Sequence, residues 1–454
     1  MQCKVSMDLQ FCLSEKQFSL DILVMKLAML FEERCYSQIL RLVLMLLQEV
    51  LVMRLLKGKG EACGCGGGHW TLNGDFMRRI RTRLGAVELP FRRVRCSSCG
   101  RAFSPIQRLL KLGRYQTKTN ELEKLVVETV GETSYRRGVA QLRRDCGLEL
   151  PHRTAHGWVL RTDCDEITPP AERLAHPVQL LPDGTGFKGE GEGGQARRGD
   201  LKALVCVTQG GELVPVGSWA GLSWQEIHVR LKEKGVSFAP GSIVVCDGEL
   251  GLAEGFAQYV EEVQRCHWHL NRDLYHAMRL DGAGMKEARP ARRKLAAALA
   301  VELPAGDFQK VSDEDKAALA ARTDEAEGKV MRLVAELEAR GYEKAASYLR
   351  RAKAGLFGYV RRWLKWGLVS PKASSMIERV MRELARRIKN IAYGWSDRGV
   401  AKIARIILRR FADEKEWEDY WKKRFGDDLS VVVLLKNLKG SLPKGEQFSQ
   451  DLAH

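Results

Sequence analysis

Apolar and polar residues follow a helical rhythm near the start of the chain. Residues 19–56 are strongly apolar, but charged residues interrupt every window. No uncharged run there reaches the roughly 18 residues that a membrane-spanning helix needs. The order of charge, short apolar run and small-residue cleavage site that marks a signal peptide is also missing. The pattern predicts two amphipathic helices that bury their apolar faces against the rest of the chain or another subunit.

An extended rhythm follows in residues 78–95, where basic and apolar residues interleave around Gly85. This alternation predicts a β-hairpin. Four of the twelve cysteines flank it, as Cys63, Cys65, Cys96 and Cys99. Two cysteine pairs joined by a hairpin are how a zinc ribbon surrounds one ion with four thiolates. The first pair is spaced CxC, one residue short of the usual CxxC, so His69 as a substitute ligand and a hairpin without metal remain alternatives.

The helical rhythm returns in residues 117–161, with a turn at residues 147–151. Thr133 or Ser134 can cap a helix that ends near Cys146. A helix, a short turn and a basic helix form the layout of a helix-turn-helix, whose second helix enters the major groove of DNA. The alternative is an ordinary helical hairpin. The side chains expected to face DNA are Arg153, His156 and Arg161.

From residue 177 onward, short apolar runs and amphipathic segments alternate. The runs predict strands at residues 178–183, 201–209, 212–220 and 242–247, and the segment from residue 264 starts as a fifth strand. The amphipathic segments predict helices at residues 223–235 and 251–262. A three-strand meander, a helix, a parallel strand and a further helix and strand are the elements of an RNase H-like fold. In that fold the first and fourth strands run side by side.

Three acids stand out against this pattern. Asp183 and Asp247 each end a predicted strand, and Glu378 lies on an amphipathic helix rich in Arg and Lys. Carboxylates gathered in this way can hold two Mg²⁺ ions, which stabilise the attacking and leaving oxygens of phosphoryl transfer. Each acid also has a simpler explanation. Asp-Gly is a common turn dipeptide, and Glu378 could pair with Arg382 one helical turn later.

The charge of the chain favours a polyanionic partner. Lys plus Arg number 74 and Asp plus Glu 57, so 74 − 57 gives a net charge of +17. Such a surplus speeds encounters with nucleic acid. A membrane surface is the other common polyanion, but the sequence has no lipidation motif and no clean spanning segment.

Four segments of the chain carry a family resemblance. They are LLPDGTG around Asp183, VVCDGELG around Asp247, RCHWHLNRDL with Cys266 and His269, and SSMIERVMRELARR with Glu378. On these segments, which span roughly residues 177–412, the chain resembles a DDE transposase of the Mutator-like class found in bacterial insertion sequences. The ribbon and helix-turn-helix half is similar to that of such transposases too. The chain departs from the family in its CxC spacing and in Arg382, where the family often has Asn.

The resemblance implies an enzyme that cleaves DNA and transfers strands at the terminal inverted repeats of its element. Asp183, Asp247 and Glu378, rather than the nearby Glu383, would hold two Mg²⁺ (or Mn²⁺) ions. Cys266 and His269 would support this site, by positioning a DNA end or by bracing the fifth strand. Further DNA contacts are expected from Arg272, Arg379, Arg382, Arg386 and Arg387, the last four on the helix face opposite its apolar residues.

The implied partners are double-stranded DNA, at the element's ends and at the target, and a second copy of the chain in a homodimer or higher oligomer. A cytoplasmic, nucleoid-associated location in a bacterium would follow, with no membrane partner. Two alternatives stay open: an RNase H-like nuclease that only cuts, and a DNA-binding regulator that descends from a transposase. Inverted repeats beside the coding sequence would favour transposition over cutting alone.

The expected fold is a multidomain α+β chain. We expect an N-terminal helical segment (1–58), a zinc-ribbon-like hairpin (59–110), a helix-turn-helix region (111–170), the first part of an RNase H-like core (171–280), a helical insertion (281–367), the second part of the core (368–426) and a tail (427–454). The insertion contains Phe357, Tyr359, Trp363 and Trp366, which could stack on distorted DNA. For at least half of them we expect packing against the protein instead.

Overall fold

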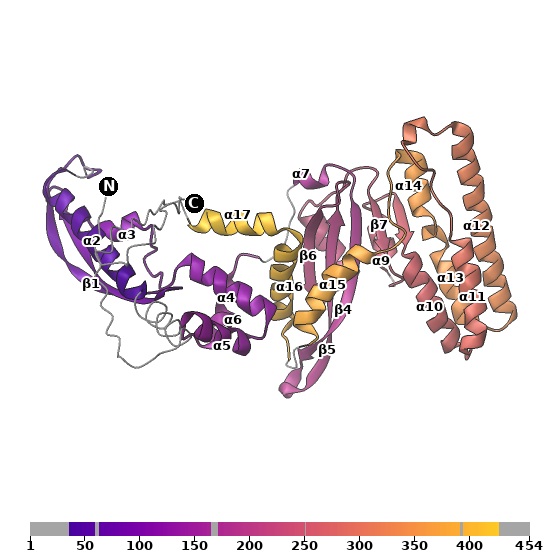
Figure 1. Cartoon of the computed structure of the whole chain (residues 1–454), viewed down its shortest axis with the longest axis horizontal. Coiled ribbons are helices and arrows are strands. Elements are labelled where there is room, and N and C mark those ends of the chain that lie inside the picture. The colour runs from indigo at the N-terminus through magenta and orange to yellow at the C-terminus, as the bar shows by residue number, and fades with distance from the viewer. Residues whose placement is uncertain (1–35, 60–62, 165–170, 250, 391–393, 426–454) are drawn as a thin grey trace, which may run out of the picture.

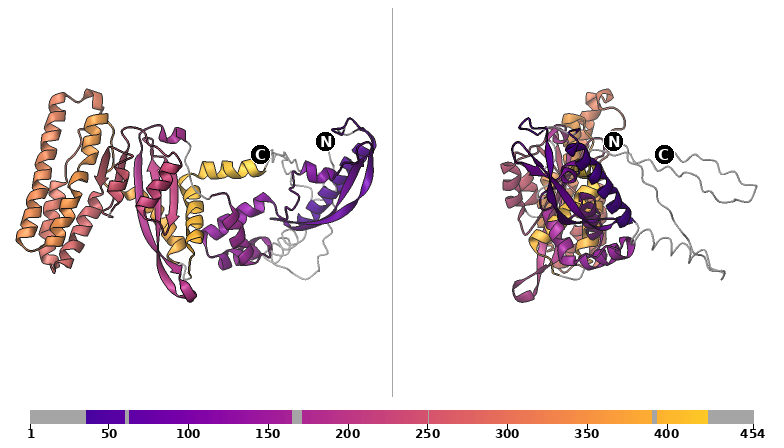
Figure 2. Two further views of the ribbon diagram at one scale, coloured as in Figure 1. Left: turned by 180° about the vertical axis from the view of Figure 1, so that it is seen from behind. Right: turned by 90° about the vertical axis from the view of Figure 1, so that its left-hand side faces the viewer.

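A computed structural model describes residues 36–59, 63–164, 171–249, 251–390 and 394–425. It is a mixed α+β protein built around a five-stranded mixed sheet. Figures 1 and 2 show a β-hairpin unit at one end, a group of helices beside it, the sheet with its covering helices next, and a helical bundle at the other end. Within the described ranges, no helix combines the length and apolarity that crossing a bilayer requires.

The predicted hairpin is confirmed and is longer than expected. Strands β1 (Trp70–Thr82) and β2 (Gly85–Cys96) pair antiparallel, and the short β3 (Ala102–Phe103) follows beside β2. Gly85 has φ of 108°, a value that favours glycine at the turn. Helix α2 (Tyr36–Leu56) lies against the hairpin, where the Gln48 side chain donates to the Pro90 carbonyl. It is one of the two helices predicted for residues 19–56; the other falls outside the described residues.

Three helices follow the hairpin unit, after the short α3 (Pro105–Leu109). They are α4 (Asn120–Glu132), α5 (Tyr135–Cys146) and α6 (His152–Arg161), followed by the short α7 (Ala171–Leu174). The Ser134 hydroxyl caps α5 by accepting from the Arg137 N–H, and Gly147 ends it in the left-handed conformation. The predicted pair of helices and its turn are therefore confirmed.

The central sheet has the strand order β6-β5-β4-β7-β8. Its strands are β4 (Gln179–Glu190), β5 (Ala196–Val207), β6 (Leu213–Ala220), β7 (Ile243–Cys246) and β8 (Glu262–Arg265). Strand β5 pairs antiparallel with both β4 and β6, and β7 runs parallel to both β4 and β8. The prediction that the first and fourth strands are neighbours is confirmed.

The structure corrects the predicted end of the first strand. Asp183 does not end β4: it pairs with Ala203 of β5, and the pairing continues to Glu190 opposite Ala196. The Asp183-Gly184 dipeptide therefore lies within a strand rather than in a turn. The helix predicted for residues 251–262 is also shorter, because α9 covers only Leu252–Phe256 and β8 begins at Glu262.

Helices cover both faces of the sheet. On one face α8 (Trp224–Glu233) and α9 pack on alternate residues such as Leu204 and Cys206. On the other, α15 (Ser375–Ile388) and α16 (Asp397–Ala412) pack on Ala203 and Val205. The apolar side of α15 is buried there, as predicted. Helix α17 (Glu414–Phe425) continues from α16 and contacts α4.

A bundle of helices separates β8 from α15. It contains α10 (His267–Leu280), α11 (Met285–Ala298), α12 (Asp313–Ala339), α13 (Glu343–Ala352) and α14 (Gly358–Trp366). Short 3₁₀ turns occur at Glu192–Gly194, Phe308–Lys310 and Lys353–Gly355. Phe357, Tyr359 and Trp363 are buried in this bundle, whereas Trp366 is 38% exposed. Three of the four aromatic residues thus pack against the protein, as we expected for at least half of them.

Candidate functional site

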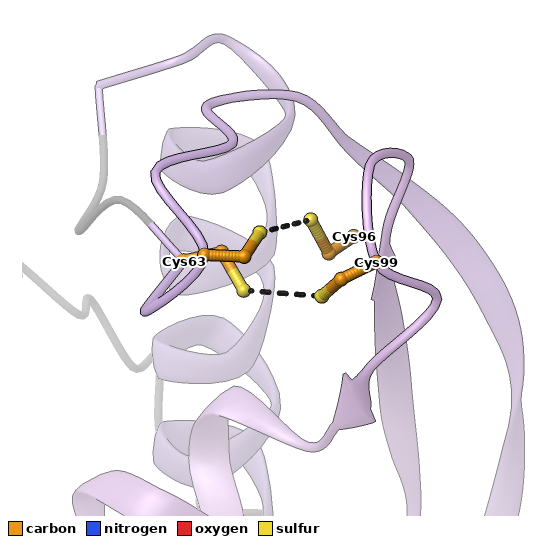
Figure 3. Close-up of side chains that lie close together, drawn as sticks. Cys63, Cys96 and Cys99 are labelled. Atoms are coloured by element: carbon orange, nitrogen blue, oxygen red, sulfur yellow. Dashed lines mark hydrogen bonds between the residues drawn. The ribbon is translucent and has the colours of Figure 1, made fainter.

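Four cysteine thiols meet at the base of the β1–β2 hairpin. The Sγ atoms of Cys63 and Cys99 are 3.6 Å apart, those of Cys65 and Cys96 are 3.7 Å apart, and all four lie within 4.8 Å of one another (Figure 3). Zinc–sulfur bonds of about 2.3 Å in a tetrahedron place sulfurs about 3.8 Å apart. The quartet therefore fits a structural metal such as zinc. His69, the alternative ligand, lies outside it.

Local backbone geometry explains how the short CxC spacing works. The Gly66 N–H donates to the Cys63 carbonyl at 2.8 Å, and the Gly100 N–H donates to the Cys96 carbonyl at 2.9 Å. Both glycines have positive φ, so each cysteine pair sits on a tight turn that other residues rarely adopt. The tight turn at Gly66 thus allows Cys63 and Cys65 to join the quartet although only one residue separates them.

The thiols of this quartet compete for ionisation. The Cys99 N–H lowers the pKa of the Cys96 thiol to about 6. The Gly67 N–H lowers the pKa of Cys65, but the crowded thiols of Cys63 and Cys99 raise it to about 11. Four thiolates this close repel one another unless a cation lies between them, which is the electrostatic reason that a metal suits this group.

A second candidate site lies where β4 and β7 run side by side. The last paired positions are Leu180 and Val244, and Asp183 and Asp247 each follow three residues later. Asp183 lies within β4 and Asp247 directly after β7, close enough for the charge of Asp247 to act on Asp183. Burial and the charges of Asp247 and Glu249 raise the pKa of Asp183 to about 6, against the lowering effects of the Gly184 N–H and His269.

Glu249 is an acid that the sequence analysis missed. Its Oε1 lies 3.7 Å from Lys202 Nζ, and Lys202 also pairs with Asp200. The Glu249 N–H donates to Asp247 Oδ1 at 2.9 Å, so the turn after β7 aims two acids at β4. The sequence did offer a signal for Glu249, because this second acid follows Asp247 by only two residues in the Asp-Gly-Glu run after the strand.

Cys266 and His269 join β8 and α10 to the start of the Glu378 helix. The Ser374 N–H donates to Cys266 Sγ, and the Ser374 hydroxyl lies 3.4 Å from His269 Nδ1. Burial raises the pKa of Cys266, but hydrogen bonds with His269 and Ser374 bring it down to about 7. These contacts tie the residue that follows β8, and the first turn of α10, to the residue before α15.

Glu378 follows Ser374 by one helical turn, and its N–H donates to the Ser374 carbonyl. It therefore lies in the first turn of α15, on the helix that the Cys266–His269 pair anchors. Among the described residues, the cysteine quartet is the one group of three or more metal-ligating side chains gathered closely enough to hold an ion. The charge of Asp247 acts on Asp183, so these two acids lie near each other, whereas the described residues form no group at ligand spacing that includes Glu378.

The residues predicted to contact DNA differ in how exposed they are. Arg153, Arg161, Arg272, Arg379, Arg382 and Arg386 are exposed. His156 is half-buried and packs edge-on against Tyr135. Arg387 is only 1% exposed, and its Nε donates to the Val130 carbonyl of α4. The prediction that Arg387 lies on the open face of its helix is wrong, because the side chain points into the junction with α4 and α5.

A comparison with protein-family models finds none that matches this chain, and a comparison with curated proteins finds no match either.

Proposed function

We propose that the chain is a DNA transposase of the DDE type, similar to the Mutator-like class, with an RNase H-like core. The observation that carries the proposal is a pair of neighbouring aspartates, Asp183 within β4 and Asp247 directly after β7, where β4 and β7 run parallel. Burial raises the pKa of Asp183, and the charge of Asp247 raises it further, so the fold holds two mutually repelling acids near each other. Such an arrangement costs stability and is typical of a functional site.

The donor set suits a hard divalent cation. Asp183 and Asp247 offer carboxylate oxygens, the ligands that Mg²⁺ prefers, and a cation would relieve the repulsion between them. Glu378, in the first turn of α15, would supply the third carboxylate by moving toward the two aspartates when the ions and DNA bind. Two such ions would stabilise the attacking and leaving oxygens of a phosphodiester displacement. The protein's own part is to fix the two strands and the helix start that present these acids.

The rest of the chain would bind and align DNA. The basic helix α6, with exposed Arg153 and Arg161, would read the element's ends as the second helix of a helix-turn-helix. The zinc-bound hairpin would contact phosphates through its arginines. Since two ends must be joined, we propose that the active form is at least a dimer.

A plasmid assay tests this function. A marker gene would be flanked by the DNA that naturally borders the reading frame, and the protein supplied in trans. We expect marker insertion into a second plasmid, lost in Asp183→Asn, Asp247→Asn and Glu378→Gln. Cutting without joining would favour the nuclease, and binding without cutting would favour the regulator; either result would overturn the transposase.

A further inference from the structure

Lys202 is a lysine that the fold buries on the central sheet. Its side chain is 7% exposed, and it lies on β5 directly opposite Gly184 of β4. Leu204 and Cys206, further along β5, pack against α8 and α9. Because side chains alternate along a strand, Lys202 lies on this same face of the sheet, and Asp183 lies on the other. Lysine is rarely buried without an acidic partner, and the partners of Lys202 lie on this face.

Two carboxylates meet the Lys202 ammonium on this face. Asp200 forms an ion pair with it, and Glu249 Oε1 lies 3.7 Å from its Nζ. Asp200 belongs to β5 itself, whereas Glu249 follows the end of β7 by three residues. Strand β4 lies between β5 and β7 in the sheet, so the Glu249 side chain reaches across β4 to meet Lys202. This contact fastens the segment after β7 to a strand two places away.

Glycine at position 184 leaves room for this crossing. A Cβ at Gly184 would lie 3.5 Å from Glu249 Oε2 and 3.7 Å from Asp200 Oδ1. A longer side chain there would occupy the space in which the two carboxylates and the ammonium meet. Lys202 Nζ also lies 5.9 Å from the centre of the Trp224 ring, at the start of α8. Acids and an aromatic ring thus fix the position of the ammonium.

The backbone of Glu249 connects this contact to the proposed active site. The Glu249 N–H donates to Asp247 Oδ1 at 2.9 Å, so the position of the Glu249 backbone sets the direction of that carboxylate. Carboxylates that bind a metal are themselves hydrogen-bonded, and the loss of such outer partners weakens metal binding. Lys202 is therefore linked, through Glu249, to a carboxylate that would hold an ion.

We propose that Lys202 is a positioning residue of the phosphoryl-transfer site: by holding the Glu249 side chain, it fixes the N–H that orients the Asp247 carboxylate. Lys202 itself, buried on the other face of the sheet, touches neither the ions nor DNA. This inference rests on the proposed function, which assigns Asp247 to the metal site. Its sign is distinctive. Removal of a nearby cation should by charge alone tighten the binding of a metal ion, whereas loss of a positioning contact should weaken it.

Metal binding in the absence of DNA tests the inference without any catalysis. Mn²⁺ would be titrated into the purified chain, with free Mn²⁺ followed by electron paramagnetic resonance. The binding that counts is the part that Asp183→Asn abolishes. We expect Lys202→Met to weaken it by about ten- to a hundredfold. Lys202→Arg, which keeps the charge and can still reach Glu249, should restore most of the affinity.

A double-mutant cycle shows whether Lys202 acts through Glu249. In a chain that already carries Glu249→Ala, the contact is absent. Lys202→Met should then cause no further weakening of Mn²⁺ binding, although it weakens binding in the wild-type background. If Lys202→Met does not fold, as judged by circular dichroism, Lys202→Gln takes its place in both backgrounds with the same expected result.

The matched control is Lys365→Met on α14. Lys365 also pairs with a glutamate, Glu261, and lies over a tryptophan ring, that of Trp366, so the same kinds of contact are lost elsewhere. Its Mn²⁺ binding should equal that of the wild type. Unchanged or tighter binding in Lys202→Met, or equal weakening with and without Glu249→Ala, would overturn the inference. A wild-type chain with no Mn²⁺ binding that depends on Asp183 would instead overturn the proposed function, and the role of Lys202 with it.

Discussion

Asp183 is the residue at which function and stability conflict most clearly. Its raised pKa, about 6, means that the folded chain holds a proton which the unfolded chain releases at lower pH. Stability should therefore fall as pH rises from the ordinary aspartate range to about 6, and the full cost is present at neutral pH. A bound cation would remove this cost.

Asp183→Asn should stabilise the metal-free protein at pH 7. The substitution removes the buried charge, and two pKa units correspond to at most about 3 kcal/mol in the free energy of unfolding. In urea titrations with EDTA, the gain should largely vanish at pH 4, where Asp183 is protonated in the folded wild type. Glu233→Gln, at an exposed position of α8, is the control and should change stability by less than about 0.5 kcal/mol. A destabilised Asn variant at pH 7 would contradict the account.

His228 gives the chain a second pH dependence, of opposite sign. It is 4% exposed, neither ring nitrogen has a hydrogen-bond partner among the described residues, and burial lowers its pKa to about 4. Between the ordinary histidine pKa of about 6.5 and about 4, the unfolded chain binds a proton that the folded chain does not, so stability falls with falling pH.

His228→Phe should weaken this loss. The difference in unfolding free energy between pH 7 and pH 5 should shrink by up to about 2 kcal/mol. The same change at His276, which is exposed on α10, should leave the difference unaltered. Equal pH profiles for wild type and His228→Phe would show that the imidazole is not held neutral.

The burial of Arg387 was open to prediction from the sequence. It follows Val380 by seven residues and Leu384 by three, so helical periodicity puts it on the apolar side of α15. The sequence-based prediction instead grouped Arg387 with the other arginines of the helix, on the face that the apolar residues leave open. A side chain's charge proved a weaker guide to its orientation than its position on the helix.

Among the elements, the cysteine hairpin makes the most direct prediction. Cys96→Ser should reduce the zinc content of purified protein from about one ion per chain to nearly none, because a structural site needs all four ligands. Cys63 and Cys96 also belong to the apolar cluster under α2, so limited proteolysis should cut the variant faster between α2 and β2. Cys146→Ser, outside the quartet, should keep its zinc. Full zinc in Cys96→Ser would exclude the quartet as the site.

Periodicity predicted the hairpin and the three helices, because each depends on local alternation. The order of the elements, which is that of an RNase H-like fold, predicted the adjacency of β4 and β7. Periodicity failed at Asp183-Gly184, where turn chemistry suggested an end to the strand. Twelve consecutive pairings with β5 outweigh the turn preference of that dipeptide. Local preference cannot reveal a partner strand that continues.

At the scale of the whole molecule, Arg387 connects the three-helix region to the sheet. Its guanidinium carbon lies 4.8 Å from the Trp395 ring centre and 5.6 Å from that of Tyr135 on α5. Arg387→Ala should lower the free energy of unfolding by about 2 to 4 kcal/mol, through a cavity and lost hydrogen-bond and cation–π contacts. Arg386→Ala, an exposed neighbour, should change it by less than about 0.5 kcal/mol. Similar losses from both in urea denaturation would contradict this role.

The central claim is that Asp183 and Asp247, together with Glu378, form one phosphoryl-transfer site. The most direct test is Mg²⁺-dependent strand transfer in vitro, on DNA that carries the native flanking sequence, by the wild-type chain and by Asp247→Asn. We predict that the variant still binds this DNA but loses at least about a thousandfold in strand-transfer rate, since the ions that stabilise both oxygens would lose a ligand. Strand transfer by Asp247→Asn at the wild-type rate would contradict the account.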